Sequence, residues 1–264
     1  MNNGPLALNG FVVRIGLMSM LFLGFIHLSN GAPAPSARFE SGQTQTSLLE
    51  LYTSEGCSSC PPAEKWLSQL QQSPGLWKTF VPVAFHVDYW NHLGWRDKWS
   101  KPEFTARQEA YSRAWASESV YTPAFVLNGR EWHAQNPIPS AASSNPGTLV
   151  VSNVGSNRWS AEFSPSKRND GPYEVHLAVL ISGVGVDVGA GENSGRHLEH
   201  DFVVVALKDA SMDRHGDSWK ASAEVQLESS GFGNRTGIAA WVTKQGDLVP
   251  VQATGGWMSE PAGK

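Results

Sequence analysis

Two cysteines, close together in the sequence, are the feature that most constrains this chain. Cys57 and Cys60 lie in the stretch "LYTSEGCSSCPPAEKW", and the 264 residues contain no other cysteine. A disulfide framework needs cysteines far apart in sequence to close long loops, so this pair cannot provide one. Two such cysteines can form a disulfide across a turn, and unpaired N–H groups at the start of a helix lower the pKa of a thiol. The pair therefore predicts a local site whose chemistry depends on the fold around it.

The first residues of the chain predict a targeting segment. Arg14 is the only charged residue before an apolar run over residues 15–28, and small residues follow that run. The run has the length of a signal-peptide core and is short for a membrane span. We predict a signal peptide over residues 1–31, with an uncleaved anchor as the alternative and no stable membrane span after cleavage. The protein is therefore expected to be periplasmic or secreted, where disulfides persist.

The overall charge limits the possible partners. The net charge is −4 and 17% of the residues are charged. A mild negative charge argues against a nucleic-acid partner and against a strongly anionic membrane surface. About 230 residues remain after the signal peptide, which suggests one large domain or two small ones.

Strand and helix patterns alternate in the first half of the mature chain. The run "SLLELYT" predicts a strand, "PPAEKWLSQLQQS" a helix directly after Cys60, and "FVPVAFHVDYW" a second strand with Pro82 at an edge or a strand start. Ser100 and Glu103 form a capping box that predicts a further helix.

The segment that follows predicts a hairpin and completes this pattern. In "TPAFVLNGREWHA", two strands flank Asn128-Gly129, the residue pair typical of a tight turn. The order β-α-β-α-β-β, with a right-handed parallel crossover, is the thioredoxin arrangement. We therefore predict a thioredoxin-like domain over residues 45–135.

A change of pattern marks the second half of the chain. Residues 135–147, rich in Pro, Ser and Asn, predict a linker. Short alternating or apolar runs separated by turn residues then predict an antiparallel β domain over residues 148–258. The expected fold class is thus α/β, with a thioredoxin-like N-terminal domain followed by an antiparallel all-β, sandwich-like C-terminal domain.

Pro123, in "VYTPAF", precedes the third strand of the predicted thioredoxin-like domain. Thioredoxin-like proteins carry a cis-proline at this place, beside the redox pair, and cis X-Pro bonds are otherwise uncommon. The backbone of Thr122 would then face the pair, where an extended substrate can bind by strand addition.

Four stretches together carry a resemblance to a known family. They are "ELYTSEGCSSCPPAEKWL", "FHVDYWNHLGW", "SVYTPAFVLNG" and "GENSGRHLEH". The chain resembles domain of unknown function 1223, a family of exported bacterial proteins, from about Leu49 to about Trp241. The resemblance implies a thioredoxin-like fold on the N-terminal side and a C-S-S-C pair at Cys57 and Cys60, and it implies no established reaction. Pro61 departs from the redox pattern because it disfavours helical geometry for Cys60, which places Cys60 at the helix cap.

The first hypothesis for function is thiol–disulfide exchange on exported proteins that carry thiols or disulfides. Cys57 would be the more exposed, attacking thiol and Cys60 the resolving thiol, with Thr122 and Pro123 as the docking corner. No organic cofactor is expected, since the electrons come from partner dithiols.

The aromatic segment "DYWNHLGWRDKW" lies between the second predicted strand and the capped helix. Trp90 and Trp95 from this segment either wall a groove for an extended peptide or pack the segment onto the sheet. We include both among the predicted substrate-binding residues.

Other hypotheses use the same residues differently. A disulfide that never exchanges would make the protein a non-enzymatic binding module. Two thiolates joined by His86 or His92 would instead handle Cu(I). His197 and His200 form an H-x-x-H pattern leading into a strand, but a regular strand places the two rings on opposite faces, so we predict no metal ligands there and interpret residues 191–196 as a turn.

Overall fold

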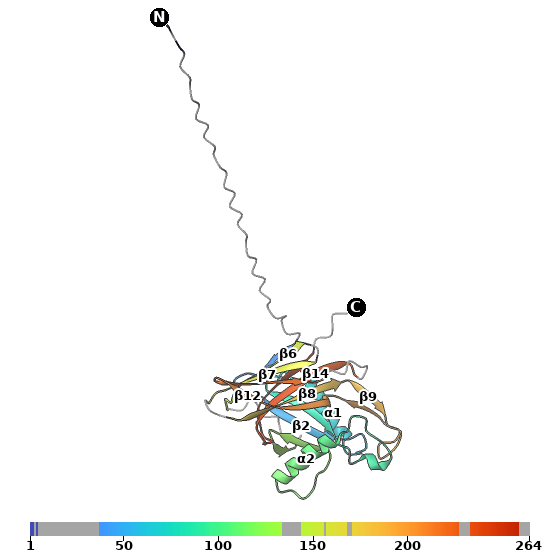
Figure 1. Ribbon diagram of the computed structural model, residues 1–264. Helices are drawn as coiled ribbons and strands as arrows, with labels where there is room; N and C mark the ends of the chain where they lie inside the picture. The colour runs from blue at the N-terminus through green and yellow to red at the C-terminus, as the bar shows by residue number, and fades with distance from the viewer. Residues whose placement is uncertain are drawn as a thin grey trace. The chain divides into compact units, whose positions relative to one another are not determined.

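β-Strands are the main secondary structure of the described residues, and most of these strands form two large sheets (Figure 1). The structure, a computed structural model, describes residues 37–133, 144–155, 157–167, 171–226 and 233–258, together with Met1, Asn2 and Gly4. Residues 34–264 form one compact unit. Nearly all of the predicted signal peptide and most of the predicted linker lie outside the described residues.

The larger sheet contains eight of the described strands in the order β15-β14-β8-β11-β3-β2-β4-β5. Strands β2 and β3 are parallel and are joined through a helix, whereas β8, β11, β14 and β15 pair antiparallel with their neighbours from the same group. Their bounds are β2 Ser47–Thr53, β3 Phe80–His86, β4 Ala124–Leu127, β5 Arg130–Trp132, β8 Tyr173–Ser182, β11 Val203–Ser211, β14 Arg235–Lys244 and β15 Pro250–Trp257.

The remaining strands form a five-stranded sheet, in the order β1-β6-β7-β13-β12, and a small pair, β10-β9. The five-stranded sheet consists of β1 Arg38–Glu40, β6 Gly147–Gly155, β7 Arg158–Pro165, β12 Asp213–His215 and β13 Ser218–Glu224, and the pair of β9 Val184–Asp187 and β10 His197–His200. The described helices are α1 Pro61–Gln69 and α2 Pro102–Ala114, with short 3₁₀ turns at Leu70–Gln72 and Asn91–Leu93.

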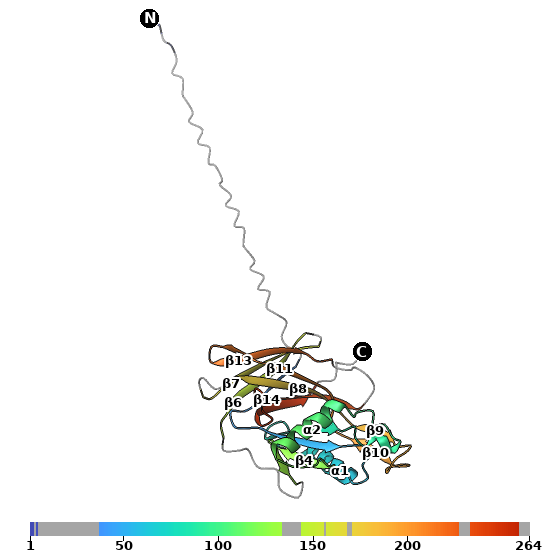
Figure 2. The same cartoon turned by 60° about the horizontal axis from the view of Figure 1, so that its bottom comes forward.

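Both faces of the eight-stranded sheet are covered. Successive side chains of a strand point to opposite faces. Accordingly, Leu48 of β2 packs in the same cluster as Phe104 of α2, whereas Leu49 packs with Leu67 of α1. A third cluster fills the space between β6 and β7 on one side and β8 and β14 on the other. Figures 1 and 2 show the resulting layers, with β8 and β14 between α2 and the five-stranded sheet.

The predicted α/β fold class is wrong, because the protein is predominantly β and its two predicted segments share one sheet. Strand β3 is not an edge. Val203 of β11 is its parallel partner at Ala84, and the Ala84 N–H donates to the Phe202 carbonyl at 2.8 Å. Pro82 is tolerated inside the sheet because β11 pairs with β3 at Ala84 and not at Pro82.

Local predictions for helices and turns are confirmed in part. The predicted strand over residues 47–53 matches β2. The predicted capping box is wrong, since Lys101 is the N-cap of α2 and the hydroxyl of Ser100 donates to the Asp97 carbonyl at 2.7 Å. The turn between β4 and β5 is confirmed, with φ of 50° at Asn128 and 77° at Gly129.

Replacement of Gly129 by alanine is expected to lower the free energy of unfolding by about 1–2 kcal/mol, because an L-residue is strained at positive φ. The added Cβ would also lie 3.1 Å from the Cα of Val249. Urea denaturation of Gly129→Ala measures the loss. Gly42→Ala is the matched control, since the nearest atom to its added Cβ lies at 3.6 Å, and an equal loss in both variants would contradict the prediction.

Candidate functional site

The two cysteines form a disulfide between the end of β2 and the start of α1. Their Cα atoms are 5.5 Å apart. Cys60 is the N-cap of α1, as the sequence predicted, and its carbonyl accepts the N–H groups of Ala63 and Glu64. Its backbone is nevertheless helical, with φ −77° and ψ −34°, so the expected effect of Pro61 on its geometry is wrong.

Both cysteines are covered. Cys57 and Cys60 are each 0% exposed, whereas Ser58 and Ser59 between them are exposed. The expectation of a more exposed Cys57 is therefore wrong. The exposure of both serines places the disulfide directly beneath the protein surface, not deep in the core.

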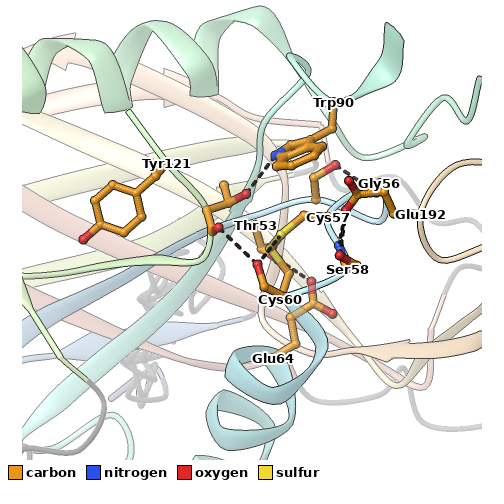
Figure 3. Close-up of a disulfide and its surroundings, with 12 residues drawn as sticks. Thr53, Gly56, Cys57, Ser58, Cys60, Glu64, Trp90, Tyr121 and Glu192 are labelled. Atoms are coloured by element: carbon orange, nitrogen blue, oxygen red, sulfur yellow. Dashed lines mark hydrogen bonds between the residues drawn. A yellow bond between two sulfur atoms is a disulfide. The ribbon is translucent and has the colours of Figure 1, made fainter. Parts of the chain in front are cut away.

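Part of this cover is a loop from the second half of the chain, residues 189–196, which we name the cover loop. The side-chain amide of Asn193 donates to the carbonyls of Glu55 and Cys57, both at 2.9 Å. The carboxylate of Glu192 accepts the Ser58 N–H at 3.1 Å and the Ser58 hydroxyl at 2.7 Å (Figure 3). These bonds from Ser58 lower the pKa of Glu192. Polar contacts thus hold the cover loop on the cysteine turn.

The proline corner lies against the same turn. The Thr122–Pro123 peptide bond is cis, as the sequence predicted. The Ser59 hydroxyl donates to the Thr122 carbonyl at 3.4 Å and lies 3.4 Å from Sγ of Cys57. The indole of Trp90 donates to the Thr122 hydroxyl at 2.8 Å. The structure therefore brings Cys57, Thr122, Pro123 and Trp90 together.

A groove of about 470 Å³ begins at this corner. Its lining includes Ser59, Pro62, Trp66, Tyr121, Pro123 and Trp132. Trp66 and Trp132 thus supply the indole rings of its wall, in place of the predicted Trp90 and Trp95. Trp95 packs elsewhere, where its indole donates to the Glu55 carboxylate at 2.6 Å.

Five buried ionisable side chains gather beside the disulfide turn. They come from the turn itself, α1, β3, the loop before α2 and β10. We name them the buried cluster: Glu55, Glu64, His86, Asp97 and His200. Each is at most 6% exposed. Charges removed from water in this way are costly unless they pair with one another or with an ion.

The charges of the buried cluster shift one another's pKa values. Burial opposes the imidazolium form of His86, but Asp97 and the two glutamates outweigh it and raise its pKa to about 9. Burial also opposes the carboxylates of Glu64 and Asp97, yet the neighbouring histidines lower both pKa values. The pKa of Glu55 is raised by burial and by the nearby Asp97.

Sequence reasoning placed His86 near the cysteines but missed the rest of this arrangement. The sequence features that pointed to the buried cluster were the glutamates on both sides of the C-x-x-C pair and the histidine at the end of β3. No local pattern marks Asn193, because its partners lie 136 and 138 residues away. His197 and His200 fall on opposite faces of β10, one exposed and one buried, as expected.

The fold and the site define a β-rich protein of two packed sheets that holds a C-x-x-C disulfide beneath a polar loop. Residues 48–243 match the family described as "protein of unknown function (DUF1223)", and the chain belongs to this family. No curated protein matches the chain. No helix in the described part of the chain is long and apolar enough to cross a bilayer.

Two solved structures are similar in fold. A crystal structure of an Agrobacterium tumefaciens protein is 23% identical, with a TM-score of 0.59, and the match covers 84% of this chain and 98% of that chain. HBP35 of Porphyromonas gingivalis is 14% identical, with a TM-score of 0.54, and the match covers 85% of this chain and 79% of that chain. At these identities the likeness concerns the fold alone.

Proposed function

We propose that this protein exchanges disulfides with extended segments of other exported proteins, in the periplasm or outside the cell. The supporting observation is the disulfide directly beneath the surface at one end of a groove, with Ser59 in contact with both Cys57 and the Thr122 carbonyl. The groove offers indole and proline surfaces to apolar side chains of a bound segment.

The exchange proceeds in two displacements at sulfur. A thiolate of the partner attacks Sγ of Cys57, the Cys57–Cys60 bond breaks, and Cys60 leaves as a thiolate. A second thiolate of the partner then attacks the partner's own sulfur in the mixed disulfide and releases Cys57 as a thiolate. The partner loses two electrons and gains a disulfide, and Cys57 and Cys60 take up the two protons that its thiols lost.

Access to Cys57 requires the cover loop to move. The loop is attached by two exposed hydrogen bonds to Glu192 and two buried ones from Asn193. Segments held by few polar contacts open at a small fraction of the free energy of global unfolding. Exchange in this protein is therefore gated by local opening.

Burial of both cysteines favours a second candidate, a binding module with a structural disulfide. In that case the groove binds its partner without any change at sulfur. A Cu(I) site built from two thiolates requires reduced cysteines, whereas Cys57 and Cys60 form a disulfide. His92, one of the two histidines considered for that site, is exposed, and its Nδ1 contacts the Tyr89 carbonyl.

Replacement of Cys57 or Cys60 by serine separates the two candidates. With a reduced two-cysteine peptide as partner, exchange predicts that either variant reduces the rate of peptide oxidation to the uncatalysed background. Ser58→Ala keeps both sulfurs and is expected to oxidise the peptide at least as fast as the wild type, because it loses one hydrogen bond that holds the cover loop. A wild-type rate equal to background, together with a lower melting temperature in the variants, would instead support a structural disulfide.

A further inference from the structure

The buried cluster holds more charge than its own pairs neutralise. Three carboxylates and two imidazoles lie together, and only the imidazoles can carry positive charge. The basic partners that the ion pairs give to Glu55, Glu64 and Asp97 are His86 and His200. Two imidazolium ions can therefore balance at most two of the three carboxylates.

His86 is oriented toward the other members of the cluster. Its Nδ1 lies 2.7 Å from a carboxylate oxygen of Asp97. A carboxylate at Nδ1 fixes the ring and leaves Nε2 as the free donor atom, which is the arrangement of metal-bound histidines. In the described part of the chain, buried Nε2 of His86 has no hydrogen-bond partner.

The ring nitrogens of His200 are also buried without hydrogen-bond partners in the described part of the chain. Its Nδ1 lies 2.8 Å from a Glu64 oxygen, but among the described residues neither nitrogen has a hydrogen-bond partner. The close contact therefore lacks the alignment of a hydrogen bond. Nε2 of His200 lies 3.7 Å from Oε1 of Glu55, an oxygen that is also buried and without a hydrogen-bond partner there.

We propose that Glu64, His86 and His200 bind a divalent transition-metal ion of the zinc class. Glu64, His86 and His200 each offer an atom within 4.8 Å of the others. Zinc accepts imidazole nitrogen and carboxylate oxygen at about 2.0–2.2 Å, and two histidines with one glutamate are a ligand set that zinc uses in proteins. A divalent ion supplies the two positive charges that protonated imidazoles would otherwise supply, so His86 and His200 can bind it as neutral ligands.

Neighbouring side chains hold the ligands in place. Asp97 orients His86, and the Thr53 hydroxyl donates to Glu64. Such supporting bonds are typical of protein metal sites. The ion would tie α1, β3 and β10 together, and the oxidised cysteines would not take part in binding.

The test measures Zn²⁺ in the oxidised full-length protein. Refolding with one equivalent of Zn²⁺ gives the ion access to this buried site, and metal analysis after gel filtration is expected to find one Zn²⁺ per chain. His200→Ala and Glu64→Gln are each expected to lose this ion, and a chelator during refolding is expected to lower the melting temperature of the wild type alone.

His197→Ala is the matched control, because this exposed histidine lies on the same strand and contacts Asp187. It and the Cys57→Ser/Cys60→Ser variant are expected to keep the ion, which separates this site from the proposed exchange. If either ligand variant does not fold, Co²⁺ in the wild type provides the readout, through visible bands of nitrogen and oxygen ligation. Wild-type protein without bound metal, or full Zn²⁺ in both ligand variants, would overturn the proposal.

Discussion

Replacement of Arg107 by methionine is expected to lower the free energy of unfolding by about 3–5 kcal/mol, because it leaves the Glu50 carboxylate buried without its partner. Glu50 is 0% exposed. The guanidinium donates to both of its oxygens, from Nε at 2.8 Å and from Nη2 at 3.2 Å. Truncation of one member of such a pair removes the compensation for a desolvated charge.

The surroundings of this ion pair make the loss larger than at a surface bridge. The hydroxyls of Tyr52 and Tyr111 also donate to Glu50, and burial followed by the Glu50 charge raises the pKa of both phenols, so they remain donors. The guanidinium lies 5.2 Å from the ring centroid of Trp241 on β14. Arg107 thus connects α2 with strands from both halves of the chain.

Urea denaturation followed by fluorescence measures this effect. Arg113→Ala is the control, because Arg113 is exposed on the same helix and pairs with Glu109 at 3.5 Å, where we expect a change below about 1 kcal/mol. Glu50→Gln combined with Arg107→Met removes both charges and is expected to recover part of the loss. Equal losses for Arg107→Met and Arg113→Ala would show that the buried pair contributes little.

Replacement of Asn193 by alanine is expected to accelerate reduction of the Cys57–Cys60 disulfide by roughly 5- to 150-fold. The variant loses two buried hydrogen bonds to the carbonyls of Glu55 and Cys57. Each such bond contributes about 0.5–1.5 kcal/mol. About 1.4 kcal/mol corresponds to a factor of ten. Loss of both bonds therefore raises the population with an open cover loop, and with it the rate of reduction, by the range given above.

Reduction by dithiothreitol under native conditions, with thiols trapped by alkylation, measures the rate. Ser194→Ala is the control within the cover loop. Among the described residues, the exposed hydroxyl of Ser194 donates only within the loop, to the Gly189 carbonyl at 3.3 Å. It is expected to react at the wild-type rate. An unchanged rate in Asn193→Ala would mean that other residues limit access to Cys57.

The sequence predicts the local elements of this fold better than their assembly. Periodicity locates β2 and α1, and turn chemistry locates the Asn128-Gly129 hairpin. The prediction of the fold class missed the pairing of β3 with β11, at Ala84 and Val203, which joins the two predicted domains in one sheet. Periodicity reports which face of a strand is buried and does not report which distant strand lies beside it.

The residues of the candidate site also differ in how far the local sequence predicts them. Cys57, Cys60 and Pro123 carry local signals, since short-range spacing and a proline before a strand define them. Asn193 and His200 lie in the stretch "GENSGRHLEH", but nothing local indicates their contacts, because each reaches its partners through chain topology. An exposed or a buried histidine looks the same in a sequence until the face of its strand is known.

The junction of β3 with β11 has a consequence for the order of events during synthesis. A nascent chain that has emerged as far as residue 135 lacks β11, so β3 presents an open backbone edge, which promotes association with other chains. It also lacks Trp241, which stacks on the guanidinium of Arg107. Asn193, which holds the cover loop against the disulfide turn, and His200, which pairs with Glu64 in the buried cluster, are missing as well. The first half of the polypeptide therefore cannot complete its fold until the last hundred residues have left the ribosome.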